Sequence, residues 1–139
     1  MAALDFMKTM AIAASGLRAQ AGRMRVIAEN LANADSLATR PGEAPYRRRV
    51  PTFESRFDQD LQSEVVRLGR IREDASAFPS RHEPGHPAAN QAGYVQLPNV
   101  NTMIEQMDFR QAQRSYEANL GVVGATRRMV ARTLDILRG

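Results

Sequence analysis

A long stretch toward the C-terminus constrains the fold more than any other part of the sequence. Residues 100–137 contain no proline, and their apolar side chains recur every three or four positions. This spacing predicts one amphipathic helix that begins after Pro98, with Thr102 and Glu105 as a capping box at its start. The apolar stripe, which only Arg127 interrupts, consists of Phe109, Ala112, Tyr116, Leu120, Val123, Val130, Leu134 and Leu137. Such a helix would be about 50 Å long, so another element must lie along it.

Residues 4–33 predict a second long helix. Apolar side chains there alternate spacings of three and four, which is the coiled-coil pattern. One heptad position holds Met7, Ala14, Ala21 and Ala28, and the other holds Met10, Leu17, Met24 and Leu31. Alanine layers allow a partner helix to approach closely. An ordinary buried helix also predicts an apolar stripe, but not this regularity over four heptads.

Both helices are apolar on more than one side. Beyond the two stripes, further apolar residues are Phe6, Ile12, Ala13, Val26 and Ile27 on the first helix and Val122, Met129 and Ile136 on the second. A helix that is apolar around much of its circumference is buried on several sides, which two helices of one chain cannot provide. We therefore infer neighbouring copies or partner chains. The interior glycines agree with close packing. Each one lowers the stability of a helix by about 1 kcal/mol relative to alanine, and this loss is offset more easily where helices or backbones pack closely. They are Gly16, Gly22, Gly121 and Gly124.

The segment between the helices has a different composition. Pro51 limits residues 46–53 to an edge strand at most, and Phe53, Phe57 and Leu61 have the spacing of a helical turn or two. Residues 64–72 alternate weakly, with a possible bulge at Gly69. Residues 94–97 predict a short strand.

The predicted fold is therefore mainly α. Two long terminal helices pack as an antiparallel coiled coil, with a small irregular or β-hairpin insert between them. We expect a division into residues 1–33 for the first helix, 34–99 for the insert and 100–139 for the second helix.

The composition excludes several functions. Although the net charge is +4, the arginines are spread along the chain and the run at residues 47–49 has no interleaved aromatics, so we expect no nucleic-acid partner. The absence of cysteine rules out disulfides and thiolate sites. No run approaches a membrane span, and the N-terminus lacks the features of a cleaved secretory signal, so we expect any export to keep the N-terminus.

One segment matches a catalytic motif. Residues 82–86 read HEPGH, the H-E-x-x-H pattern in which a helix presents two zinc-binding histidines and a glutamate base. Pro84 and Gly85 break a helix at its middle positions, and the chain has no third histidine. We expect a proline-rich turn and no metal, cofactor, small-molecule substrate or enzymatic activity.

Several segments of the chain contain distinctive sequence motifs. Residues 15–20 read SGLRAQ and residues 27–33 read IAENLAN, a motif typical of rod and hook proteins. More specific are TRPGEAPYRR at 39–48, EPGHP at 83–87 and GYVQLPNVN at 93–101. RSYEAN at 114–119 is a further such segment. Together these segments resemble the rod proteins of the bacterial flagellar axial family, and the resemblance covers nearly the whole chain.

The resemblance implies a structural subunit of the flagellar proximal rod, exported through the flagellar type III apparatus to the periplasmic part of the basal body. Its implied partners are copies of itself, other proximal and distal rod proteins, and the adaptor at the export gate and inner-membrane ring. The expected assembly interface is Met10, Leu17, Met24, Leu31, Asn30, Asn33, Phe109, Tyr116, Asn119, Leu120, Val123, Val130, Leu134 and Leu137. The alternatives are another rod or hook-proximal subunit, and a soluble coiled-coil adaptor or export chaperone.

Overall fold

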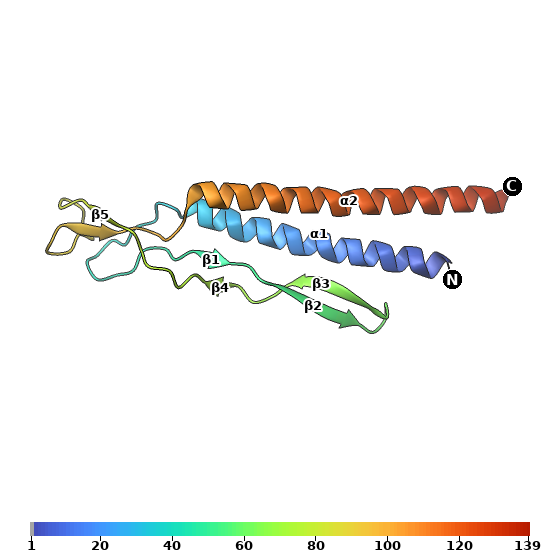
Figure 1. Ribbon diagram of the computed structural model, residues 1–139, viewed down its shortest axis with the longest axis horizontal. Helices are drawn as coiled ribbons and strands as arrows, with labels where there is room; N and C mark the ends of the chain where they lie inside the picture. The colour runs from blue at the N-terminus through green and yellow to red at the C-terminus, as the bar shows by residue number, and fades with distance from the viewer. Residues whose placement is uncertain (1) are drawn as a thin grey trace. The chain divides into compact units, whose positions relative to one another are not determined.

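Two long helices and six short strands make up residues 2–139, the part of the chain that the computed structural model describes (Figure 1). The helices are α1 (Ala2–Ala32) and α2 (Thr102–Arg138). The strands are β1 (Arg49–Val50), β2 (Phe53–Asp58), β3 (Ser63–Leu68), β4 (Arg72–Glu73), β5 (Ser80–His82) and β6 (Tyr94–Gln96). The predicted fold class, with long terminal helices and a small β insert between them, is confirmed.

The chain forms two compact units, and each is described by itself. Unit 1 comprises the described residues up to Met24, Thr52–Arg70 and Arg110–Gly139. Unit 2 comprises Arg25–Pro51 and Ile71–Phe109. The division predicted from the sequence, into 1–33, 34–99 and 100–139, follows the order of elements along the chain and stays a prediction about domains.

In unit 1, α1 and α2 run antiparallel (Figure 1). The side chains buried along them are small. A Cβ atom at Gly16 would lie 2.8 Å from Nδ2 of Asn119, so glycine lets α2 approach closely at this point. Closer to the C-terminal end of α1, Nη2 of Arg23 donates a hydrogen bond to Oε1 of Gln111 on α2 at 3.3 Å. The buried side chains along the two helices here are Ala13, Ser15, Ala19, Ala112 and Thr126.

Strands β2 and β3 form an antiparallel hairpin whose register runs from Phe53 opposite Leu68 to Asp58 opposite Ser63. The prediction of a helical turn at Phe53, Phe57 and Leu61 is wrong. Phe53 and Phe57 are four residues apart, a spacing that puts side chains on one side of a strand as well as of a helix. The side chain of Asp58 then closes the turn, because its Oδ1 accepts from the N–H groups of Asp60 at 3.0 Å and Leu61 at 3.1 Å.

The hairpin docks against α1. The Ser15 hydroxyl donates to the carbonyl of Ile12 at 2.6 Å and accepts from the N–H of Val66 at 3.3 Å, so it satisfies a backbone group of β3. Leu68 packs over Gly22, where a Cβ atom would lie 2.8 Å from its Cδ2. The hairpin register is one to one and Gly69 lies after β3, so the predicted bulge at Gly69 is wrong.

Unit 2 contains two further pairs of short antiparallel strands, β1 with β4 and β5 with β6. The predicted strand at 94–97 is confirmed as β6, and its Val95 is 1% exposed. Each described sheet has two strands. The buried apolar side chains that α1 contributes to this unit are Val26 and Ile27.

The start of α2 differs from the prediction. Asn101, not Thr102, is the N-cap, because its Oδ1 accepts from the N–H groups of Met103 at 3.1 Å and Ile104 at 3.3 Å. The side chain of Glu105, the expected partner in a capping box, is instead bonded to residues from other segments.

Candidate functional site

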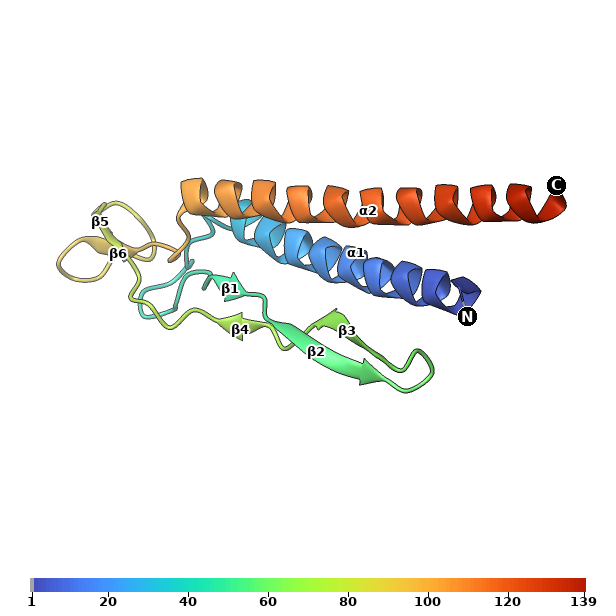
Figure 2. The same ribbon diagram turned by 45° about the vertical axis from the view of Figure 1, so that its right-hand side comes forward.

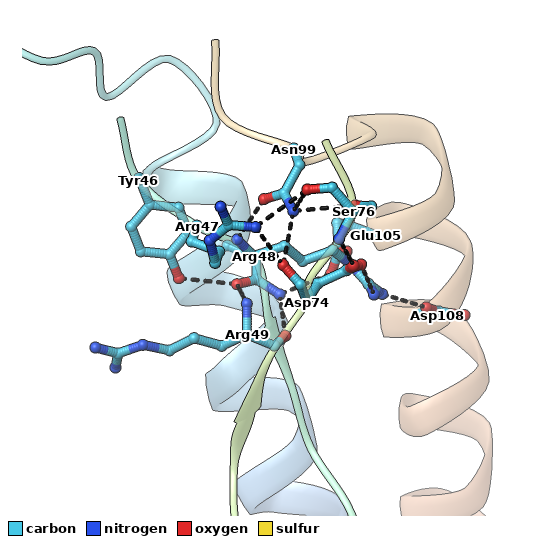
Figure 3. A network of polar contacts seen from close by, with 10 residues as sticks. Tyr46, Arg47, Arg48, Arg49, Asp74, Ser76, Asn99, Glu105 and Asp108 are labelled. Carbon is cyan, nitrogen blue, oxygen red and sulfur yellow. Dashed lines mark hydrogen bonds and ion pairs between the residues drawn. The ribbon is translucent and has the colours of Figure 1, made fainter. Parts of the chain in front are cut away.

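A buried polar cluster is the most elaborate side-chain arrangement in unit 2 (Figure 3). It joins α1, the segment around β1, the segment after β4, the residues before α2 and the first turn of α2. We define the polar cluster as Asn30, Tyr46, Arg48, Asp74, Asn99 and Glu105.

Asn30 is 0% exposed and uses all its hydrogen-bonding capacity. Its Oδ1 accepts from the Tyr46 hydroxyl at 2.8 Å and from the N–H of Arg49 at 2.9 Å. Its Nδ2 donates to the carbonyl of Arg49 at 2.8 Å and to Oε2 of Glu105 at 3.2 Å. Burial raises the pKa of Tyr46, although Arg49 opposes this, so the hydroxyl stays protonated as a donor. Asn30 therefore fixes β1 against α1 and α2.

Arg48 provides the positive charge of the polar cluster. Its Nε donates to Oε1 of Glu105, which is 0% exposed, and its Nη1 lies 3.3 Å from Oδ2 of Asp74. A third carboxylate, Asp108, lies 3.7 Å from Nη2. Burial alone would lower the pKa of Arg48, but the hydrogen bonds and charges of Glu105 and Asp74 outweigh it and raise the pKa. The guanidinium compensates the charge of a carboxylate that water does not reach.

Asn99 and Asp74 hold the outer part of the polar cluster. Oδ1 of Asn99 accepts from the N–H of Arg48 at 2.7 Å, while its Nδ2 donates to the carbonyl of Asp74 at 3.0 Å. The N–H of Ser76 donates to Oδ1 of Asp74 at 2.9 Å. This bond, a second one from the Ser76 side chain and then the charge of Arg48 lower the pKa of the Asp74 carboxyl. Arg47 stacks on Phe78, with its guanidinium carbon 4.1 Å from the ring centre.

The polar cluster is a structural arrangement. Its charged groups are paired with one another, so it presents no nucleophile beside a free base. Sequence reasoning placed Asn30 in the assembly interface and Glu105 in a capping box, and it predicted no part of the polar cluster. The segments that carried the most specific family resemblance, 39–48 and 93–101, are the ones that supply Tyr46, Arg48 and Asn99.

The metalloprotease-like segment does not have the geometry of a zinc site. His82 lies in β5 rather than on a helix, and its ring packs edge-on against Tyr94 with centroids 5.0 Å apart. Nδ1 of His86 accepts from the N–H of Ala88, and Glu83 pairs with Arg81 at 2.7 Å. Within residues 2–139, no group of three or more histidine or acidic side chains is arranged to hold a metal ion.

The predicted interface residues of α1 are partly covered within the chain. Met10, Leu17, Met24, Leu31 and Asn33 are half-buried, and Asn30 is fully buried. The side chains that α1 buries completely in unit 1 are the small ones, Ala13, Ser15 and Ala19. The predicted stripe is thus adjacent to the tightest packing rather than at its centre, and it remains a predicted interface.

The predicted interface residues of α2 fall into two groups. Phe109, Tyr116, Asn119, Val123 and Val130 are half-buried, whereas Leu120, Leu134 and Leu137 are exposed. Thr126, which sequence reasoning missed, is 4% exposed, and its hydroxyl donates to the carbonyl of Val122 at 2.8 Å. Its signal in the sequence is the spacing of seven from Ala112 through Asn119 to Thr126.

Neither helix is long and apolar enough to cross a membrane, as far as residues 2–139 show.

Two protein-family models match this chain, one over most of α1 and one over most of α2. Residues 10–36 match the family model described as flagella basal body rod protein, and residues 91–136 match the one described as flagellar basal body rod FlgEFG protein C-terminal. The chain is therefore a protein of the flagellar rod class, and the proteins of this class are structural.

Curated relatives narrow the assignment. The flagellar basal-body rod protein FlgC of Agrobacterium fabrum is 46% identical, over 91% of this chain and 91% of its own. Those of Bacillus subtilis and Salmonella typhimurium are 38% and 37% identical, each over 90% of this chain. The chain belongs to the FlgC family of flagellar basal-body rod proteins. It is a structural subunit of the rod in the flagellar basal body.

Proposed function

We propose that this chain is a subunit of the proximal rod, where it transmits motor torque from the inner-membrane ring to the distal rod. Its partners are copies of itself, the other proximal and distal rod proteins, and the adaptor at the export gate and inner-membrane ring. Membership of the FlgC family supports a rod subunit over a free coiled-coil adaptor or export chaperone.

One observation carries the proposal. The last turns of α2 expose Leu134 at 49%, Ile136 at 79% and Leu137 at 78%. Burying a side chain of this kind stabilises an assembly by about 1.5–3 kcal/mol. The described residues leave these side chains in water, and neighbouring rod subunits would cover them.

The length of the helices supports a mechanical role. Helix α2 has 37 residues and α1 has 31, which gives lengths of about 55 Å and 46 Å. Within unit 2, the polar cluster bonds the C-terminal part of α1 to the first turn of α2 through buried side chains. A load on one helix would pass to the other through these bonds.

Export through the flagellar type III apparatus, without a cleaved signal, fits the energetics of the helices. Most of the stability of a helix in a protein comes from packing of its apolar face, and isolated helices are marginal. A chain whose second helix leaves apolar side chains exposed would become fully ordered only beside its neighbours in the periplasmic rod.

The proposed assembly interface comprises the stripe residues of both helices. The changes Leu17→Asp and Val123→Asp should abolish rod assembly, but both residues are half-buried and such chains can fail to fold. Leu137→Asp avoids this, because Leu137 is 78% exposed. Its matched control is Gln113→Asp, which also places an acid on an exposed position of α2.

The decisive experiment deletes the gene in its native bacterium, scores swimming and images isolated basal bodies. Inner rings without a completed rod, restored by the intact gene, are expected. Leu137→Asp should fail to restore swimming where Gln113→Asp restores it. Swimming deletion cells with complete basal bodies would contradict the proposal. In solution, a stable helical dimer by sedimentation and circular dichroism would favour the adaptor.

A further inference from the structure

Helix α2 is packed on one side in unit 1. Its inner side carries the buried residues Ala112 and Thr126, and Asn119 there approaches Gly16 of α1. The opposite side is defined here as the outer face and consists of Arg114, Ala118, Gly121, Ala125, Arg128 and Arg132. These residues follow one another at spacings of three and four, so they share one side of the helix.

The packing of residues 2–139 does not require a glycine at position 121. A glycine inside a helix lowers its stability relative to alanine. The close packing of this chain explains the glycines at Gly16 and Gly22, because a Cβ atom there would lie 2.8 Å from a neighbouring side chain. At Gly121, a Cβ atom would have no heavy atom of the described residues within 4 Å, apart from the helix's own adjacent backbone. The glycine therefore fits an approach from outside the chain.

The outer face is also basic. Arg114, Arg128 and Arg132 are exposed, and none of them forms an ion pair within residues 2–139. The outer face thus has small side chains between arginines, a composition that would favour a large side chain flanked by acids.

The tip of the β2–β3 hairpin has this complementary chemistry. The hairpin tip is defined as residues 57–64, which include Asp58, Asp60 and Glu64 and no basic residue. Phe57 is 54% exposed and directly opposite Glu64 in the register, so the two side chains lie on the same face of the hairpin. None of the three acids forms an ion pair among the described residues.

We infer that the hairpin tip of one copy docks on the outer face of α2 in a second copy of this chain. Phe57 would lie over Ala118 and Gly121, and Glu64 would pair with Arg128. This inference rests on the proposed function, because it specifies one contact of that helical assembly.

The contact has to be between copies. In unit 1 the hairpin packs against α1 through Ser15 and Val66. Helix α1 lies between the hairpin and α2 (Figure 2), and the outer face is on the side of α2 opposite the buried residues Ala112 and Thr126. The two surfaces differ, so the contact is head-to-tail. A head-to-tail contact that does not close into a ring propagates as a helix, which is the geometry that a rod needs.

Cross-linking in assembled basal bodies tests the contact, and the chain has no cysteine of its own. Two differently tagged chains, one with Gln59→Cys and one with Ala118→Cys, are produced together in the deletion strain, and isolated basal bodies are oxidised. A mixed disulfide dimer is expected. The control pairs Gln59→Cys with Ala21→Cys, which is exposed on α1, and should give none.

The outcomes separate the two proposals. Swimming cells whose basal bodies contain both chains but no mixed dimer would overturn the inference and leave the proposed function standing. Equal dimer yields in the control pair would overturn it too. Basal bodies that are complete without either chain would overturn both.

Charge reversal gives an independent test. Arg128→Glu should lower the yield of mixed dimer about tenfold, since like charges would then face each other. Glu64→Arg in the same chain should restore it. The matched control is Arg127→Glu, the adjacent exposed arginine on another side of α2, which should change the yield little. Loss of swimming with Arg128→Glu that Glu64→Arg does not rescue would assign the outer face to a different rod protein and overturn the inference.

Discussion

Asn30 and Glu105 meet in a buried hydrogen bond although they are 75 positions apart in the sequence. The bond runs from Nδ2 of Asn30 to Oε2 of Glu105 at 3.2 Å, and both residues are 0% exposed. A buried carboxylate is costly unless it is paired and hydrogen-bonded, and here Arg48 provides the pairing. The joint between the two terminal helices in unit 2 is thus polar.

Replacing Asn30 tests the joint directly. Asn30→Ala removes four hydrogen bonds and leaves the Tyr46 hydroxyl and the backbone of Arg49 without partners. Buried unsatisfied groups cost about 1–3 kcal/mol each, so we expect a loss of about 2–4 kcal/mol in the free energy of unfolding. Urea unfolding followed by circular dichroism measures it. The control is Asn33→Ala, whose half-buried side chain bonds only nearby residues of its own turn, and it should cost under about 1 kcal/mol.

The charge pair of Arg48 and Glu105 should behave as a unit. Arg48→Met leaves a fully buried carboxylate without its cation, and we expect a loss of about 3–5 kcal/mol. The double variant Arg48→Met with Glu105→Gln should regain much of it, because the unpaired charge is gone while an amide can still bond Asn30. Arg49→Met is the control, since the Arg49–Glu29 pair is 50% and 43% exposed and contributes about 0–1 kcal/mol. Equal losses of stability in Arg48→Met and Arg49→Met would contradict this account.

Stability should also depend on the ionisation of Asp74. Its pKa is lowered in the folded chain by the hydrogen bonds of Ser76 and by Arg48. The stabilisation is therefore complete above the unfolded pKa of about 3.9 and is lost as the pH falls through the lower folded value. Unfolding measured from pH 6 downward should show a steep decline that Asp74→Asn makes shallower. Ser76→Ala keeps the N–H bond and removes only the side-chain bond, so it should raise the pKa of Asp74 part of the way in an NMR titration. An unchanged value would count against the side-chain bond as a cause.

Gln62 in the hairpin turn is strained. Its φ is 48°, in the left-handed region, and no other described non-glycine residue has a positive φ. Gln62→Gly should raise the free energy of unfolding by about 0.5–1 kcal/mol, because glycine adopts this backbone without steric conflict. The gain is checked by thermal unfolding. Gln59→Gly in the same turn is the control and should lower stability, since Gln59 does not have a positive φ.

Much of the fold could be predicted because periodicity reports burial along a helix. Both long helices follow from the spacing of apolar residues, and Pro98 limits where the second one begins. The hairpin was harder, since the spacing of Phe53 and Phe57 fits either a strand or a helix. Its turn depends on the side-chain bonds of Asp58, which no apolar pattern reports.

The polar cluster could not be predicted from local pattern. Glu105 has the position of a capping residue, but the tertiary partners Arg48 and Asn30 hold its side chain instead. On α2, Thr126 is buried and Leu120 is exposed, because Thr126 lies on the side of the helix that is packed. The Thr126 hydroxyl can be buried there since it donates to the backbone carbonyl of Val122. Contacts between residues this far apart in sequence require the fold itself.

Gly121→Ala should separate the stability of the isolated chain from its assembly. A methyl group at Gly121 meets nothing within 4 Å in the described residues, so alanine should raise the free energy of unfolding by about 0.5–1 kcal/mol. Gly22→Ala is the matched control on α1, where the new Cβ atom would lie 2.8 Å from Leu68 and the gain should disappear. If the outer face receives a second copy, the stabilised Gly121→Ala chain should nevertheless enter basal bodies less efficiently than the unaltered chain, measured by competition between tagged chains in one strain. An alanine variant that is both more stable and equally well incorporated would remove close approach as the reason for the glycine.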